Sequence, residues 1–335
     1  MIDTTVELPD APPIPGLRFR LFDPASDYPA FVDLIREANL ADGMDWIPTV
    51  EALRSDHEHH AEFDPRRDVV LAEVDGRLVA AATTDVRTRD GVGNHHLEGW
   101  VRPAWRRCGL GRALLGWTEA RAAAVARVDG RPPERILSSW PDDGQAGALA
   151  LYESAGYLVV RYGFMMVRDL AEPIPDRPMP DGLEVRPVVE ADHRRIWDAD
   201  AEAFRDHWNP AERTDADFVA WYASPDVDTT LWQVAWDGDE VAGSIFTGIY
   251  PAENEALGVA RGWLDHISVR RPWRRRGLAS ALIARSFLVL RERGMTEAAL
   301  GVDAENLSGA LRVYESMGFR RSRTSRSYRK EFTAG

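Results

Sequence analysis

The sequence contains the same block twice, and this repetition constrains the fold more than any other feature. Residues 101–115 read VRPAWRRCGLGRALL and residues 269–283 read VRRPWRRRGLASALI. A second pair of blocks follows, GALALYESAGY at 147–157 and GALRVYESMGF at 309–319. Self-similarity at a long spacing indicates one structural unit that occurs twice. The chain of 335 residues also has the length of two ordinary domains.

Each copy has the same predicted order of elements. An Asp-Gly pair lies between two apolar runs at 75–76 and again at 237–238, which predicts a tight hairpin in each copy. Around this hairpin each copy predicts a strand and helices before it, then strand, helix, strand, helix and strand. This order is typical of an α+β fold, here an α/β sandwich with a mixed sheet. We predict domains at 17–170 and 183–332, joined by a proline-rich linker at 171–182.

The repeated loops have the composition of a phosphate-binding turn. In the second copy a predicted strand, 263–269, leads through an arginine-rich loop and Gly277 into a predicted helix, 279–291. The first turn of a helix has unpaired N–H groups and a partial positive charge, and glycine lets the backbone approach a ligand. The pattern therefore predicts a diphosphate site. A dinucleotide-binding turn, the rival, needs three spaced glycines after the first strand, whereas this loop follows the fourth.

At these blocks the chain resembles the GNAT superfamily of acetyl-CoA-dependent N-acetyltransferases. Both loops match its diphosphate motif, Q/R-x-x-G-x-G/A: Arg106, Gly109 and Gly111 in the first copy, and Arg274, Gly277 and Ala279 in the second. Asn306 and Tyr314 match the family's later motif. The resemblance covers nearly the whole chain and implies two tandem GNAT folds, each with a mixed, splayed central sheet flanked by helices. The doubled architecture is similar to that of mycothiol synthase-like and antibiotic-acetyltransferase-like members.

The resemblance implies acetyl-CoA as the co-substrate and no metal. In the family the strand before the loop parts from its neighbour and pairs with the pantetheine arm, which implies main-chain roles for Ile267 and Val269. Asn306 would hold the amides of the same arm. The other implied cofactor-binding residues lie in the two loops: Arg274, Arg275, Arg276, Gly277, Leu278, Ala279 and Ser280, and in the first copy Val101, Arg106, Arg107, Gly109, Gly111 and Arg112.

Tyr314 stands where the family has its general acid for the leaving thiolate, and Tyr152 is its counterpart in the first copy. A phenol with a pKa of ~10 can protonate a thiolate of similar basicity. The two copies differ at the family's asparagine, because Gly144 stands where the second copy has Asn306. We therefore expect the second copy to be catalytic and the first to be degenerate or structural.

Attack by an amine needs a proton acceptor, and Asp265 is the candidate base. A period of two would place alternate strand residues on one face: Trp263, Asp265, Ile267 and Val269. That face would adjoin the cofactor gap, and His266 would point away in a structural role. A purely salt-bridged Asp265 stays an open alternative. The early helical region supplies candidate acceptor-lining aromatic residues: Phe204, Trp208, Trp221 and Trp232.

Charge and cysteine content narrow the function classes. The net charge of −13 disfavours nucleic acid as a partner. The single cysteine, Cys108, excludes an intrachain disulfide and fits a reducing compartment. Residues 1–16 lack a signal-peptide pattern and the chain has no run of ~18 apolar residues, so we expect a cytoplasmic protein without a membrane partner. The histidines of 57–60 predict a solvated helix face rather than a metal site.

The sequence thus predicts an acetyltransferase. It would transfer acetyl from acetyl-CoA to a primary amine of a small molecule by direct attack in a ternary complex, with Tyr314 as general acid. Two alternatives stay open: a non-catalytic acyl-CoA-binding sensor or scaffold, and a protein or peptide N-acetyltransferase. We expect either a monomer, in which the two copies form a pseudo-dimer, or a homodimer.

Overall fold

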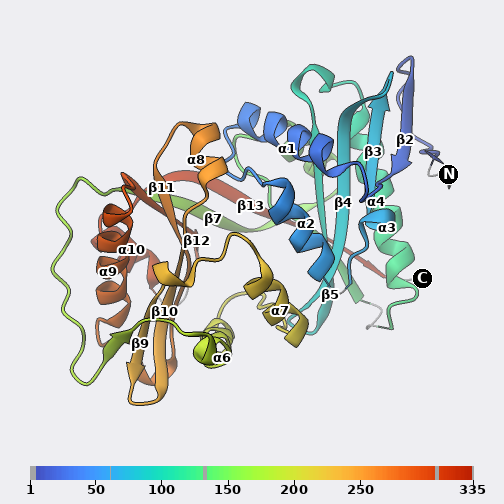
Figure 1. Ribbon diagram of the computed structural model, residues 1–335. Helices are drawn as coiled ribbons and strands as arrows, with labels where there is room; N and C mark the ends of the chain where they lie inside the picture. The colour runs from blue at the N-terminus through green and yellow to red at the C-terminus, as the bar shows by residue number, and fades with distance from the viewer. Residues whose placement is uncertain (1–4, 61, 131–133, 306–308, 334–335) are drawn as a thin grey trace. The chain divides into compact units, whose positions relative to one another are not determined.

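A computed structural model describes residues 5–60, 62–130, 134–305 and 309–333, which belong to two compact units (Figure 1). The N-terminal unit comprises Met1–Arg161 and Ser325–Gly335, and the C-terminal unit comprises Tyr162–Thr324. Each unit contains one copy of the repeated loop and the helix that follows it.

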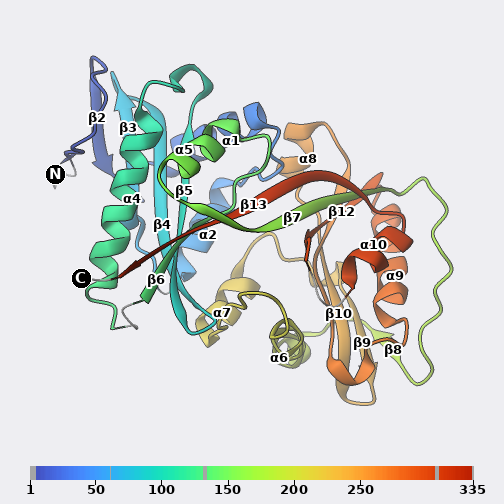
Figure 2. The same cartoon turned by 180° about the vertical axis from the view of Figure 1, so that it is seen from behind.

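The N-terminal unit is a mixed sheet with helices on both faces. Its strands follow one another in the order β1 (Thr5–Val6), β2 (Leu17–Leu21), β3 (Val69–Val74), β4 (Arg77–Arg89), β5 (Val92–Val101), β6 (Glu134–Ser139) and the end of β13 (Arg320–Thr333). Only the β5–β6 pair is parallel among these described pairs. Figures 1 and 2 show the helices of the two faces: α1 (Tyr28–Asp42), α2 (Val50–His59) and the short α3 (Pro65–Asp68), and behind them α4 (Leu110–Ala126) and α5 (Ala146–Ser154).

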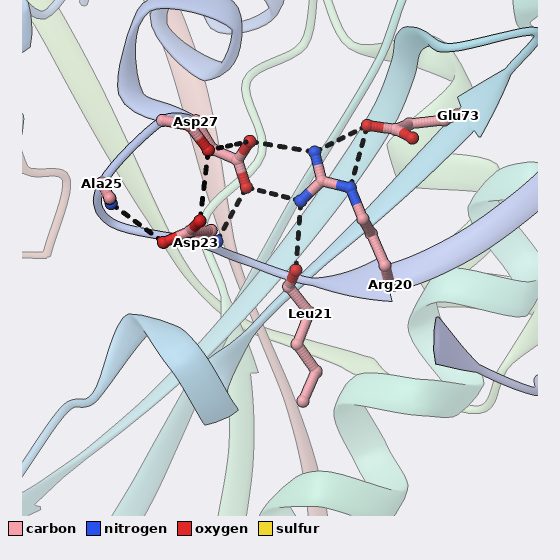
Figure 3. A network of polar contacts seen from close by, with 7 residues as sticks. Arg20, Leu21, Asp23, Ala25, Asp27 and Glu73 are labelled. Atoms are coloured by element: carbon pink, nitrogen blue, oxygen red, sulfur yellow. Dashed lines mark hydrogen bonds and ion pairs between the residues drawn. The ribbon is translucent and has the colours of Figure 1, made fainter. Parts of the chain in front are cut away.

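A charged network fixes the turn from β2 into α1 (Figure 3). The Arg20 guanidinium donates to both carboxylate oxygens of Asp27, at 2.5 and 2.9 Å, and to Glu73 of β3 at 2.6 Å. Asp27 also accepts the main-chain N–H of Asp23, at 2.7 Å. Bidentate arginine–carboxylate pairs are geometrically specific. The network therefore sets where the strand ends and the first helix begins.

The C-terminal unit repeats this plan. Its strands lie in the order β7 (Leu158–Asp169), β12 (Glu297–Asp303), β11 (Arg261–Val269), β10 (Glu240–Gly248), β9 (Gln233–Asp237) and β8 (Glu184–Arg186). Its helices are α6 (His193–Phe204) and α7 (Asp215–Ala223) before the hairpin, α8 (Pro251–Leu257) between β10 and β11, and α9 (Leu278–Glu292) and α10 (Ala310–Ser316) after the loop. The predicted fold class, a mixed sheet flanked by helices in each copy, is confirmed.

Helix α8 is an addition that the sequence analysis missed. The first copy has only the turn at Asp90 and Gly91 between the corresponding strands. In the second copy Pro251 occupies the first turn of α8, and Gly258 ends the helix with a φ of 67°. Proline at a helix start and left-handed glycine just beyond its end are recognised helix boundaries, so the signal was present but short.

The last strand of the chain completes the sheet of the N-terminal unit. Residues of β13 from Tyr328 to Thr333 pair antiparallel with β6, and the buried Tyr328 hydroxyl donates to Glu153 at 2.8 Å. In the C-terminal unit, residues 163–169 of β7 pair with β12. Each unit thus contains a strand from the opposite half of the sequence. The limits of the compact units therefore differ from the predicted boundaries at 170 and 183.

The proline-rich segment 171–182 belongs to the C-terminal unit. Ile174 and Met179 pack against its core, and the N–H of Leu183 donates to Pro180 at 3.1 Å. The segment before β2 does the same in the N-terminal unit, where Leu8 is buried and Ile14 packs beside it. Both segments act as part of a domain core as well as a connection.

Candidate active site

The parallel strands β11 and β12 part after three residue pairs. Pairing runs from Arg261 and Glu297 to Trp263 and Ala299. Beyond Trp263, β11 continues to Val269 with strand partners on its β10 side, while β12 continues beside β7. Among the described residues, the main-chain groups along one edge of 264–269 therefore have no strand partner, and such groups form other hydrogen bonds. In the N-terminal unit the β5–β6 pairing likewise ends at His96 while β5 runs on to Val101.

A β-bulge places Asp265 at the start of this opening. Phe246 is opposite His266, but the next residue, Thr247, is opposite Leu264, so Asp265 is the extra residue. The β4–β5 pair of the first copy shows no such shift. Asp265 is therefore an insertion relative to the first copy. Bulges redirect side chains and are frequent beside active sites.

The bulge makes the predicted alternation wrong. Leu264, Ile267 and Val269 pack into the same core cluster, which includes most of the buried residues of α9. Trp263 instead donates its indole N–H to Glu253 of α8, at 2.6 Å. A strict period of two would have grouped Trp263 with Ile267 and Val269. The inserted residue shifts the pattern by one position.

Asp265 is held by a residue that sequence reasoning missed. The hydroxyl of Tyr250 donates to Oδ2 of Asp265 at 2.9 Å. Desolvation raises the pKa of Asp265 to about 6, although this hydrogen bond opposes the shift. Desolvation and the nearby carboxylate also raise the pKa of Tyr250. Although part of the residue is accessible to solvent, the surrounding protein desolvates the carboxylate, and a group with a pKa near 6 can accept a proton near neutral pH.

His266, the next residue, is bound into a buried charged cluster. Its Nδ1 lies 2.9 Å from Oδ2 of Asp200, a fully buried residue of α6 that also accepts from Arg213 at 2.7 Å. The imidazole stacks on Phe246 with a centroid distance of 5.3 Å, and Trp221 lies 5.0 Å away. These contacts fix the strand position beside Asp265. They agree with the structural role predicted for His266.

The two phosphate loops have the same backbone. Arg275 and Gly277 have φ values of 60° and 88°, and Arg107 and Gly109 have 64° and 95°. Gly277 precedes α9 and Gly109 precedes α4, and neither helix has a side-chain cap. The first-turn N–H groups of both helices can therefore bind an anionic ligand.

The first arginine of each motif braces its loop. Arg274 donates through Nε to the carbonyl of Val269 at 2.8 Å and through its guanidinium to Asp206 at 2.5 Å. Arg106 repeats the contact to the carbonyl of Val101 at 3.1 Å, and its carboxylate partner is Asp42, at 2.7 and 3.0 Å. Arg271 also pairs with Asp206, and both arginines lower the pKa of this carboxyl group. Arg275, Arg276 and Arg107 are exposed.

A cavity of about 1000 Å³ adjoins the first loop. Its lining comes from the parted strand, the loop and α5, and includes Gly99, Val101, Gly109, Gly111, Arg112 and Tyr152. Pro12 and Pro13 line it as well. A methyl group on Gly109 would lie 3.2 Å from Cβ of Pro12, whereas one on Gly277 would have no atom within 4 Å among the described residues. Both glycines are exposed, but Pro12 packs beside the first loop, whereas no described residue lies as close to Gly277.

The two matched tyrosines differ in their hydroxyl contacts. Burial raises the pKa of both Tyr314 and Tyr152 to about 12. The Tyr152 hydroxyl donates to the carbonyl of Leu97 on the parted strand, at 3.3 Å. The Tyr314 hydroxyl has no hydrogen-bond partner in the part of the chain that the structure describes. Asn306 lies outside the described residues.

The predicted acceptor-lining aromatic residues separate into two groups. Phe204 and Trp221 each lie 5.0 Å from the ring of His266, and Trp208 is 37% exposed. Trp232 is only 5% exposed and stacks on Phe246 at 3.9 Å, so it is a core residue.

The prediction of a solvated histidine face at 57–60 is wrong for His57. This ring is buried, lies 3.2 Å from the hydroxyl of Tyr28, and has a pKa lowered to about 4 by desolvation. His60 lies 3.2 Å from Asp85. Among the described residues, no group of three or more His, Cys, Asp or Glu side chains could hold a metal ion. Within the described part of the chain, no helix is both long and apolar enough to cross a membrane.

Comparisons with known proteins give the same assignment for both units. The acetyltransferase (GNAT) family profile matches residues 193–319, and an acetyltransferase (GNAT) domain profile matches 65–159. A mycothiol acetyltransferase of Geodermatophilus obscurus is 30% identical over 311 residues, which is 92% of this chain and 95% of the relative. A mycothiol acetyltransferase of Clavibacter michiganensis is 33% identical, over 78% of this chain and 79% of the relative.

Solved structures agree over almost the full length. A GCN5-related N-acetyltransferase from Sphaerobacter thermophilus superposes with a TM-score of 0.72 at 29% identity, covering 98% of both chains. A tandem GNAT protein from the clavulanic acid biosynthesis pathway has a TM-score of 0.65 at 18% identity, covering 95% of this chain and 99% of that one, and shows the shared fold. The chain belongs to the GNAT family of acetyltransferases and carries two GNAT domains in tandem.

Proposed function

We propose that the C-terminal unit transfers an acetyl group from acetyl-CoA to a primary amine of a small molecule, by direct attack in a ternary complex. GNAT acetyltransferases use acetyl-CoA or another acyl-CoA. The observation that carries the proposal is the parting of β11 from β12 beside the open Gly277 loop, with Asp265 at the start of the gap.

The residues present fit this co-substrate. The uncapped N–H groups at the start of α9 would bind the diphosphate, and the exposed Arg275 and Arg276 would screen its charge. The free edge of residues 264–269 would pair with the amides of the pantetheine arm, through the main chain of Ile267 and Val269. The thioester supplies an activated acetyl group.

The chemistry then needs one base and one acid. Asp265 would take a proton from the attacking amine, for which a pKa of about 6 is well suited. As the C–N bond forms and the C–S bond breaks, Tyr314 would donate its phenolic proton to the departing sulfur. Its raised pKa keeps it protonated until that charge develops. A free main-chain N–H at the gap would polarise the thioester carbonyl.

The N-terminal unit would bind acyl-CoA without transferring the acyl group. It has the loop, the parted strands and the cavity, but the Tyr152 hydroxyl is bound to Leu97 and no bulge residue corresponds to Asp265. The names of the relatives point to mycothiol chemistry. The amine form of mycothiol, which lacks the acetyl group, is therefore the first acceptor to test.

Thiol release from acetyl-CoA across an amine panel tests this function. We expect amine-dependent release by the native chain, with Tyr314→Phe lowering kcat by ~10²-fold. Tyr152→Phe, the matched control in the first copy, should leave kcat within ~2-fold of native. Binding of acetyl-CoA without turnover for every amine would favour the acyl-CoA sensor. Turnover only with peptides would favour a peptide acetyltransferase, and unchanged kcat in Tyr314→Phe would remove the acid role.

A further inference from the structure

Gly248, Tyr250 and Asp265 form a contact that the first copy does not have. We propose that Gly248 and Tyr250 are positioning residues for Asp265: the glycine leaves the space that the carboxylate fills, and the tyrosine hydroxyl fixes one of its two oxygens, so that the other accepts the proton of the amine. This inference rests on the proposed base role of Asp265.

The space beside Gly248 is occupied by the two partners. A methyl group on this residue would lie 2.7 Å from Oδ2 of Asp265 and 2.7 Å from the hydroxyl oxygen of Tyr250. Gly248 is opposite Trp263, the last β11 residue that pairs with β12. Its φ is not positive, so the backbone at this position would accept any residue. The need for glycine here comes from the Asp265 carboxylate and the Tyr250 phenol together.

The first copy fills the equivalent position with a side chain. The pairs Ala80–Val101 and Gly243–Val269 align β4 with β10, and five residues further along Asp85 corresponds to Gly248. Asp85 carries its own carboxylate there, 3.2 Å from His60. The second copy instead brings a carboxylate to this position from the neighbouring strand, through the inserted Asp265. Gly248 and the inserted Asp265 are therefore complementary differences from the first copy, because the space beside the glycine holds the carboxylate.

Helix α8 explains how Tyr250 reaches the carboxylate. Tyr250 immediately precedes this helix, which the first copy lacks. Glu253 of α8 accepts the indole N–H of Trp263 at 2.6 Å, and Tyr250 donates to Asp265 at 2.9 Å. These two hydrogen bonds lie on either side of the point where the strands part, and Asn254 of α8 makes two more with the main chain of Arg261. The added helix, the bulge and the glycine thus all help to position the carboxylate of Asp265.

The charges around Asp265 determine what loss of the hydroxyl would do. Desolvation raises its pKa, the Tyr250 hydrogen bond and the charge of His266 lower it, and Asp226 raises it. Glu253 acts on Tyr250 in the same surroundings. Removing the hydroxyl withdraws a donor that stabilises the ionised form. The pKa of Asp265 must then rise.

The decisive experiment measures this pKa directly in the full chain. Carbon-13 labelling of aspartate carboxyl groups follows the titration of Asp265 in the native protein and in Tyr250→Phe, with Asp265→Asn identifying the signal. We expect the Tyr250→Phe pKa to be higher by ~0.5–1 unit, and the acidic limb of kcat/KM to move up equally. Tyr222→Phe removes a phenol that donates to the carbonyl of His193 and should change neither.

Gly248→Ala is the second variant. Its methyl group should displace the carboxylate, lowering kcat by ~10-fold or more while the Kd for acetyl-CoA stays native. An unchanged Asp265 pKa in Tyr250→Phe, or native kcat in Gly248→Ala, overturns the positioning roles. A native pH profile in Asp265→Asn would instead refute the base in the proposed function, and the titration would still report whether Tyr250 controls this carboxylate.

Discussion

Pro12 packs beside Gly109, at the start of the helix that follows the first phosphate loop. A methyl group on Gly109 would be 3.2 Å from Cβ and 3.7 Å from Cγ of the proline. The segment that carries Pro12 is anchored on both sides, by the buried Leu8 and by Ile14. Pro12 therefore narrows the space through which a diphosphate would approach the start of α4. We expect the first copy to bind acetyl-CoA more weakly or more slowly than the second.

Replacing Pro12 by glycine should remove that difference in part. We expect the weaker of two acetyl-CoA sites to gain ~3–10-fold in affinity, because the ring that narrows the approach to the helix start is gone. Calorimetric titration of the full chain measures both sites. Pro178→Gly is the matched control, since Pro178 stands four residues before Gly182 as Pro12 stands before Gly16. Equal effects of the two variants would contradict a narrowed approach specific to the first loop.

Adjacent arginines of the second loop should respond differently to salt. Arg275 is exposed and would act on the diphosphate through its charge, so Arg275→Ala should weaken acetyl-CoA binding by ~10-fold at low ionic strength and less at high. Arg274 holds the loop through Val269 and Asp206, so Arg274→Ala should weaken binding at all salt concentrations. Measuring Kd at several ionic strengths separates the two roles. The same salt dependence for both would refute the bracing role of Arg274.

The buried Asp200 should stabilise the C-terminal unit only where it is ionised. Burial alone would raise its pKa, but His266 and Arg213 outweigh this effect and lower it. A lowered folded-state pKa gives a contribution that is complete above the unfolded pKa of ~3.9 and is lost as the pH falls further. Asp200→Asn should therefore destabilise this unit by ~3–5 kcal/mol at pH 7.

Urea unfolding of the native chain and Asp200→Asn at neutral and acidic pH checks this prediction. The difference between them should shrink below pH ~4. Asp198→Asn, on the exposed face of the same helix, should change stability by less than ~1 kcal/mol. A difference that persists unchanged in acid would show that Asp200 acts through packing rather than charge.

Tyr328 should stabilise the N-terminal unit although it lies at the opposite end of the sequence. It is fully buried opposite Ser139 of β6. Tyr328→Ala should cost ~3–5 kcal/mol, and Tyr328→Phe, which loses only the hydrogen bond to Glu153, ~1 kcal/mol. Hydrogen exchange of residues 134–139 measures the effect. Native protection of β6 in Tyr328→Ala would be incompatible with this pairing.

The sequence was sufficient for the order of elements and for the two loops. The two copies share one fold, so the hairpins and the loop glycines appear twice in the sequence and support the same prediction. The side of the sheet that Asp265 faces could not be predicted from the sequence, because a bulge depends on the register between two paired strands. Only the register of Thr247 against Leu264 reveals it. Helix α8 was missed because seven residues show too little periodicity.

Contacts between distant segments were also beyond sequence reasoning. The carboxylates that brace the loops lie 64 residues from Arg106 and 68 residues from Arg274. A motif shows which residues recur, but it does not show which of them are hydrogen-bonded or ion-paired to other side chains. The same limit explains why Tyr250 was overlooked, since its importance depends on the inserted Asp265 15 residues away.

The exchange of β7 and β13 has a consequence for biosynthesis. The ribosome synthesises the first repeat long before residues 328–333, so the edge of the new N-terminal sheet at β6 stays unpaired until those residues have been made. Open strand edges invite aggregation. Splitting the gene at the proline-rich segment would yield two fragments that each lack a strand, and only their co-expression would restore both sheets.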